Sequence, residues 1–163
     1  MADEQTPAET EANVTPLTIN AQYIKDLSFE VPNSPSVFVE MQKNSPDINI
    51  DITVNARQLH ENTFEVSLGV NASCKVGEET GFILELDYSG AFTLSVPDEH
   101  RQPVLMIECP RLLFPFARNI IADVTRDGGF PPVMLGMVDF VAMFQRQVEA
   151  QGAAAGQPAT DDA

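Results

Sequence analysis

The chain has 163 residues, which is enough for one domain with a modest hydrophobic core. It carries 24 acidic against 9 basic residues, giving a formal net charge of -15. A field of that sign repels phosphate backbones and anionic headgroups, so nucleic acids and membrane surfaces are poor partners and basic peptides are better ones. No segment approaches the roughly 20 apolar residues of a membrane-spanning helix.

The two ends of the chain are predicted to be disordered, with one domain between them at residues 20–150. Residues 1–19 are polar and acidic without periodicity, and residues 151–163 are small or polar. Neither end can bury enough apolar surface to offset the entropy lost on ordering. Met1 is followed by acidic residues rather than by a basic and then an apolar stretch, so we expect no secretory signal and a cytoplasmic location.

The first predicted strand covers residues 22–31 and shows the alternation of a strand with two different faces. The alternation places Tyr23, Lys25 and Leu27 on one face, and Asp26 on the other. Pro32 then ends the strand, because proline cannot donate a backbone hydrogen bond to the sheet.

Three more alternating runs follow, at residues 47–56, 63–72 and 82–89. Short polar connectors join these runs, which indicates an antiparallel meander with one apolar and one polar face. The connector before them, residues 34–46, is longer and suggests a crossover between strands that are not neighbours.

The second half of the domain shows helical periodicity. Pro110 and Pro115 fit the entrance of a helix that Gly128 ends, and its apolar stripe comprises Leu113, Phe116, Ala117, Ile120 and Val124. After a rigid turn, Asp139 is placed to cap a second helix with a stripe of Phe140, Phe144 and Val148. Strands followed by helices predict an α+β fold, with a four-stranded antiparallel sheet followed by two helices.

The sequence motifs of common catalytic sites are absent from the chain. There is no phosphate-binding loop, dinucleotide fingerprint, zinc-protease motif or serine-hydrolase elbow. His60 and His100 fall in a predicted turn and loop with no Cys or carboxylate at ligand spacing, and Cys74 and Cys109 form no metal-binding pair. We therefore expect a binding protein rather than an enzyme, with no cofactor or metal and with two reduced, buried thiols.

Two surfaces of the predicted fold are candidates for binding. On the polar face of the sheet, Asp26 and Glu30 share one side of the first strand, and Ile83 lies with Glu85 on the fourth. An isoleucine among carboxylates is typical of a contact surface, although it can equally serve β structure alone. On the apolar face, strands of about ten residues span roughly 33 Å. The last helix covers only part of that length, which leaves an oligomer interface or a ligand groove.

Several segments resemble the bacterial protein-export chaperone SecB. The segment from Tyr23 to Asn33 is similar to the opening strand of that family, and four more segments follow in the family's order: Gly77–Thr80, Cys109–Arg118, Gly129–Pro131 and Asp139–Phe144. The resemblance runs from about residue 20 to residue 147 and leaves out both tails. It implies a homotetramer, a dimer of dimers in which first strands pair between protomers and long helices pack between two sheets. The implied oligomer interface includes Leu113, Phe116 and Ile120.

The resemblance also implies an activity and partners. Members of the family hold unfolded preproteins in the cytoplasm without ATP and deliver them to the motor ATPase SecA. Carried over by position, the SecA-binding surface is Asp26, Glu30, Ile83 and Glu85, which agrees with the polar face described above. The implied groove for client polypeptides lies between the second strand and the last helix, at Ile48, Ile50, Ile52, Phe144 and Val148.

Two other functions remain open from the sequence. One is an acidic adaptor that binds a single folded partner and does not hold unfolded chains. The other is a small hydrolase or isomerase built from carboxylates in the connectors: Glu78, Glu79, Asp98 and Glu99.

Overall fold

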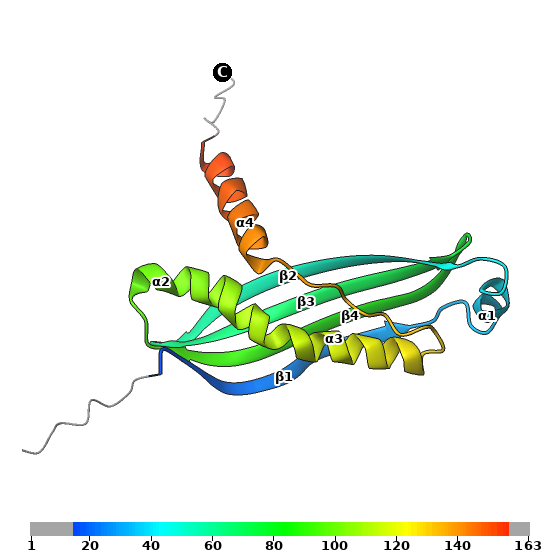
Figure 1. Ribbon diagram of the computed structural model, residues 1–163, viewed down its shortest axis with the longest axis horizontal. Coiled ribbons are helices and arrows are strands. Elements are labelled where there is room, and N and C mark those ends of the chain that lie inside the picture. The colour runs from blue at the N-terminus through cyan, green and yellow to red at the C-terminus, as the bar shows by residue number, and fades with distance from the viewer. Residues whose placement is uncertain (1–14, 157–163) are drawn as a thin grey trace, which may run out of the picture.

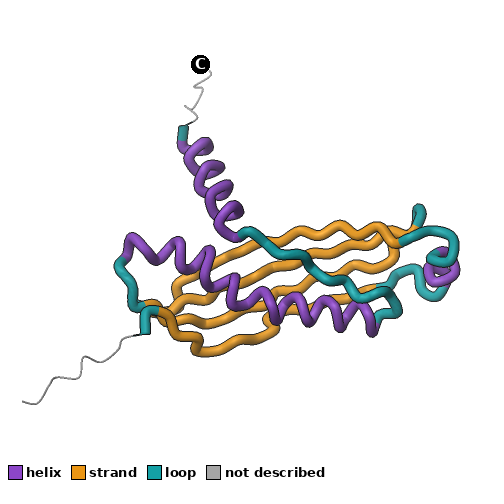
Figure 2. Tube along the Cα trace, in the orientation of Figure 1, coloured by secondary structure: helices purple, strands orange, loops and turns teal. Residues whose placement is uncertain are grey.

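The computed structural model describes residues 15–156 as an antiparallel sheet with helices packed on one side (Figures 1 and 2). The strands are β1 (Leu17–Glu30), β2 (Pro46–His60), β3 (Thr63–Val76) and β4 (Glu79–Leu94). The helices are α1 (Ser36–Glu40), α2 (Asp98–Pro103), the π-helical turn η1 (Val104–Glu108), α3 (Cys109–Asp127) and α4 (Phe140–Ala155). The predicted α+β class and four-stranded antiparallel sheet are confirmed, and the two predicted helices correspond to α3 and α4.

Regular secondary structure extends past both predicted boundaries of the domain. β1 begins at Leu17, and α4 continues to Ala155. The remaining parts of the two predicted tails, residues 1–14 and 157–163, lie outside the described residues. No helix within the described range combines the length and apolarity that a membrane crossing requires.

The strand order in the sheet is β1-β4-β3-β2, so the first two strands form opposite edges. The connector between them therefore crosses from one edge to the other, as its length suggested, and it contains the short helix α1, which was not predicted. β2, β3 and β4 form the predicted meander. Gly77, in the turn between β3 and β4, has a φ of 63°, a conformation that favours glycine.

The sheet has an inner face, which packs against the helices, and an outer face on the opposite side. On β3 and β4, alternate residues such as Leu68, Val70 and Leu84 point to the inner face and are fully buried. Cys74 and Cys109 are free and buried in this core, as predicted. Burial, followed by the charge of the neighbouring carboxylate, raises the pKa of Cys109 to about 12, so the thiol stays protonated.

β1 departs from the predicted alternation because it contains two bulges. Its register with β4 shifts at Asn20 and again at Lys25, so that each bulge inserts one extra residue. Ile24 and Leu27 both face the helices although they are three residues apart, whereas Tyr23 lies on the outer face. The prediction that Tyr23 and Lys25 share a face with Leu27 is therefore wrong.

The buried stripe of α3 also differs from the predicted one. Leu113 and Ala117 are buried as expected, but Ile121 takes the place of Ile120, and Phe116 is 49% exposed. Apolar side chains occur on two sides of this helix, and periodicity alone does not say which side the chain's own sheet covers. Pro115 lies inside the helix rather than at its entrance, because α2 and η1 precede α3 as continuous helical backbone.

The segment between α3 and α4 crosses back over the inner face of the sheet (Figure 2). Its side chains Val133 and Leu135 are buried, and the Thr125 hydroxyl accepts a hydrogen bond from the Val133 amide at 2.9 Å. The Asp139 carboxylate then caps α4 by accepting from the Ala142 amide at 3.0 Å, as predicted. α4 leaves the sheet near β2 and extends away from it (Figure 1).

Candidate binding surfaces

A groove runs along the free edge of β2, between this strand and α4. A hollow of about 660 Å³ is lined by six consecutive strand residues, from Ile50 to Asn55, and by Met143, Arg146 and Gln147 of α4. Successive strand residues point to opposite faces, so a hollow that touches all of them lies against the strand's edge. A second hollow, of about 220 Å³, shares Gln147 with the first and continues along β2 to Gln58.

The structure brings only part of the predicted client groove to this hollow. Ile50 and Ile52 line it and are half-buried, whereas Ile48 lies on the same face of β2 and is exposed outside it. The two predicted α4 residues, Phe144 and Val148, do not line the hollow. Phe144 packs toward the core, and Val148 is 51% exposed.

The α4 residues that do line the hollow were not predicted. Met143, Arg146 and Gln147 stand three and four positions apart, which places them on one side of the helix. That spacing was available in the sequence, but the sequence did not indicate which side of α4 faces β2.

The four residues of the predicted acidic surface share the outer face of the sheet. Glu30 of β1 lies directly opposite Ile83 of β4, and the Ile83 side chain is 41% exposed. Asp26 and Glu85 border a common hollow of about 200 Å³, together with Asp87. Asp87 was missed by the prediction, although the alternation of the fourth strand places it on the same face as Ile83 and Glu85.

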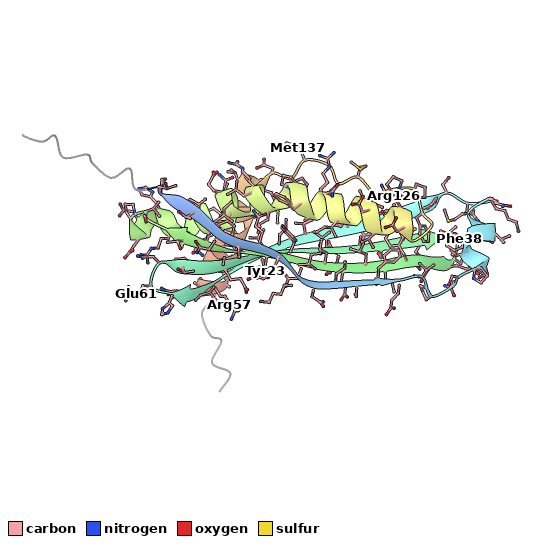
Figure 3. The ribbon with its side chains drawn as sticks, turned by 90° about the horizontal axis from the view of Figure 1, so that it is seen from below. Tyr23, Phe38, Arg57, Glu61, Arg126 and Met137 are labelled. Atoms are coloured by element: carbon pink, nitrogen blue, oxygen red, sulfur yellow. The ribbon has the colours of Figure 1, made fainter. Side chains whose placement is uncertain are left out.

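Glu65 of β3 anchors a polar cluster at the other end of the outer face, called here the Glu65 cluster. Its carboxylate accepts hydrogen bonds from Tyr23 at 2.5 Å, Lys25 at 2.7 Å and Arg57 at 2.9 Å, which together involve β1, β2 and β3. Tyr23 and Lys25 reach Glu65 across β4, where the small residue Ala91 lies opposite Glu65. Figure 3 shows Tyr23 and Arg57 on the side of the sheet away from α3.

The three contacts set the protonation states of the cluster. Hydrogen bonds from Arg57, Lys25 and Tyr23 lower the pKa of Glu65 from 4.5 to about 2, against the opposing effect of burial. Burial and the neighbouring carboxylate raise the pKa of Tyr23 to about 12. Glu65 is therefore ionised and Tyr23 is neutral at physiological pH. In these states the Tyr23 hydroxyl can donate its hydrogen bond to the Glu65 carboxylate.

A third surface is apolar and lies where β1 and α3 meet solvent. On the inner face of β1, Ile24 and Leu27 are exposed, and on α3 Leu112 and Phe116 are 40% and 49% exposed. The Phe116 ring stacks on Tyr88 at 6.0 Å between ring centroids. Leu113, predicted as an interface residue, has 0% exposure and therefore no surface left for a partner. Ile120 is half-buried.

The carboxylate pairs considered as catalytic groups do not come together. Glu78 and Glu79 lie at the turn between β3 and β4, whereas Asp98 and Glu99 begin α2 at the opposite end of the sheet (Figure 1). Across residues 15–156, no group of three or more His, Cys, Asp or Glu side chains is arranged to hold a metal ion.

Residues 10–151 match the protein family described as SecB, preprotein translocase subunit SecB. The chain belongs to the SecB family. The protein-export protein SecB of Paramagnetospirillum magneticum is 49% identical over 157 residues, covering 96% of this chain and 99% of the relative. That of Rhodospirillum rubrum is 51% identical over 150 residues, covering 92% of each chain. The predicted family is thereby confirmed, and with it the class of protein-export chaperones.

A solved structure supports the same fold assignment. A SecB-like chaperone of Mycobacterium tuberculosis, in complex with a ChAD peptide from the HigA1 antitoxin, matches with a TM-score of 0.57 and 14% sequence identity. The match covers 76% of this chain and 91% of that one. At this identity the likeness concerns the SecB fold alone.

Proposed function

We propose that the chain is a cytoplasmic, ATP-independent chaperone that binds unfolded preproteins and delivers them to SecA. The observation that carries the proposal is the groove along the free edge of β2 in a member of the SecB family. Its lining mixes apolar side chains such as Ile50 and Met143 with the backbone of an edge strand. An extended client segment can bury apolar side chains there and add hydrogen bonds to the strand. Folded proteins hide such segments, so the groove selects unfolded chains.

Each groove alone is expected to bind weakly. Burying about 400 Å² of apolar surface contributes roughly 10 kcal/mol. Fixing the backbone of about seven client residues costs on the order of 7–14 kcal/mol. Useful affinity therefore requires one long client to occupy several grooves at once, which raises the effective concentration of the second and later segments.

Several grooves on one particle require the proposed assembly, a dimer of dimers. The exposed apolar surface of β1 and α3 supports it, because Ile24, Leu27, Leu112 and Phe116 would leave water on contact with another protomer. β1 is an edge strand, so its free side is available for pairing with a second β1. Phe116 and Ile120 remain in the proposed interface, and Leu112 replaces Leu113.

Handover is proposed to use the outer face of the sheet. Asp26, Glu30 and Glu85 lie on the same face as the exposed Ile83, with Glu30 directly opposite it, a combination that suits a partner with basic and apolar side chains. Asp26, Glu30 and Glu85 line no part of the β2 groove, although Thr53 and Asn55 of β2 border both hollows. Glu85→Lys should therefore weaken SecA binding about tenfold or more while client affinity stays unchanged. Equal loss of both affinities would contradict the assignment.

Native mass spectrometry with and without an unfolded preprotein tests the whole proposal. We expect a tetramer that binds the unfolded chain and ignores the same protein once folded. The second candidate function is a dedicated adaptor, which the Mycobacterium tuberculosis complex with a single antitoxin peptide favours. An adaptor would bind one partner and show no affinity for unrelated unfolded chains.

A further inference from the structure

On the outer face of the sheet, Lys25 and Arg57 pair with Glu65 and not with the neighbouring docking carboxylates. Among the described residues, Asp26, Glu85 and Asp87 take part in no ion pair. Lys25 and Arg57 both pair with Glu65, at 2.7 Å and 2.9 Å. A third cation on this face, Lys75, lies at the far end of β3, opposite Asp47.

The separated charges nevertheless border one depression. The hollow lined by Asp26, Glu85 and Asp87 shares Asn55, Ser67 and Asp87 with the hollow lined by Lys25, Arg57 and Glu65. Lys25 also directly precedes Asp26 in the chain, and the bulge at Lys25 places both side chains on the outer face. Lysine and arginine side chains are long and flexible, so an unheld Lys25 can reach Asp26 or Asp87, and an unheld Arg57 can turn toward Asp87, which borders the same hollow.

We propose that Glu65 determines the specificity of the outer face by holding Lys25 and Arg57 away from Asp26, Glu85 and Asp87. This inference rests on the proposed function, in which those carboxylates dock a cationic partner. Without Glu65, the two cations would pair with the docking carboxylates and neutralise them. The protein would then compete internally with its own partner for the same negative charges.

The geometry makes Glu65 suited to this task. Its side chain is only 7% exposed, whereas those of Lys25 and Arg57 are 41% and 65% exposed. A buried carboxylate holds a cation more tightly than an exposed one, because solvent screens it less. The Tyr23 hydroxyl donates to the second carboxylate oxygen of Glu65 and fixes its orientation.

Four variants of the full chain separate this role from simple charge and from stability. Glu65→Gln frees both cations and is one unit less negative than the wild type at -15. Glu149→Gln, at an exposed position of α4, has the same net charge as Glu65→Gln but releases neither Lys25 nor Arg57. Glu65→Gln with Arg57→Gln has the net charge of the wild type but leaves Lys25 free. Adding Lys25→Gln to that pair removes the last free cation.

The measurement is the affinity of each variant for SecA and for an oligolysine peptide at low ionic strength, with folding and assembly checked by circular dichroism and native mass. Glu65→Gln should bind both about three- to tenfold more weakly, and the double variant should fall between it and the wild type. Glu149→Gln should stay close to the wild type. The triple variant should regain wild-type affinity or exceed it.

Recovery in the triple variant is the decisive outcome, because a merely structural role for Glu65 predicts no recovery. Wild-type affinity in Glu65→Gln, or loss that persists in the triple variant, would overturn the inference. Crystal structures give a readout that does not depend on SecA: in Glu65→Gln, the Lys25 ammonium should lie within ion-pair distance of Asp26 or Asp87. If the wild type binds oligolysine but not SecA, the proposed partner is wrong while the inference about Glu65 is still tested.

Discussion

The two edge strands of the sheet differ in how the rest of the chain fixes them. β2 keeps a regular register with β3 from Pro46 to Gln58, and its edge borders the hollow beside α4. β1 contains two bulges, and Glu65 holds side chains at the second one. A regular edge can accept different extended segments, whereas a bulged edge held by side chains suits one constant partner. We infer that β2 serves variable clients and β1 serves assembly.

The largest effect should come from placing charge on the apolar side of β1. In the variant Ile24→Asp with Leu27→Asp, assembly should be lost, because burying an unpaired carboxylate costs several kcal/mol for each residue. Sedimentation velocity should show monomers in place of the assembled particle. Val39→Asp, at an exposed site on α1, is the control and should leave the mass unchanged. An intact assembly in the double variant would remove β1 from the interface.

Two neighbouring leucines on α3, the helix beside β1, distinguish a core position from an interface position. Leu113→Ala should lower the free energy of unfolding by about 2–5 kcal/mol, because it empties a fully buried site. Leu112→Ala should cost less than about 1 kcal/mol in the protomer, because Leu112 is 40% exposed. Urea denaturation in the Ile24→Asp, Leu27→Asp background, where assembly does not contribute, measures both values. Equal costs would mean that the assignment of the buried stripe is wrong.

The attachment of β1 should also depend on pH. The pKa of Glu65 is lower in the folded protein, at about 2, than the ordinary value of 4.5, so its stabilisation is complete above that ordinary value. It is lost as the pH falls toward 2. The difference between the two pKa values corresponds to about 3 kcal/mol, which screening by solvent reduces to about 2 kcal/mol. Unfolding free energies measured from pH 6 to pH 2 should decline less steeply for Glu65→Gln than for the wild type. Parallel curves would show that Glu65 does not carry this dependence.

The smallest of these effects concerns α4 beside β2. Met143→Asp should weaken binding of an unfolded client about tenfold, because Met143 lines the hollow and its apolar contact is lost. Val148→Asp, on the same helix but outside the hollow, is the matched control and should change affinity less than about twofold. Fluorescence anisotropy with a labelled client peptide measures both. The reverse order would favour the groove expected from family resemblance.

The regular parts of the fold could be predicted from the sequence, and so could the family. Strict alternation identified β2, β3 and β4, and Asp139 marked the start of α4, because each of these signals is local. The bulges of β1 were missed since their only sequence signal is the three-residue spacing of Ile24 and Leu27. That spacing gains meaning only when β4 supplies the register.

The candidate surfaces were predictable only in part, for a related reason. Residues of one strand face, such as Ile83 and Glu85, share a surface whatever the rest of the chain does. The Glu65 cluster joins residues from three strands across a fourth, and the β2 hollow depends on the direction in which α4 leaves the sheet. Neither arrangement has a signal in local spacing.

Suppression of aggregation tests the central claim most directly. A reduced, unfolded model protein is mixed with the purified chain without ATP, and light scattering is followed over time. We expect scattering to be suppressed at about one assembled particle per client, and Met143→Asp to suppress it less well than Val148→Asp. Unchanged aggregation in the presence of a correctly assembled particle would contradict the proposed chaperone function.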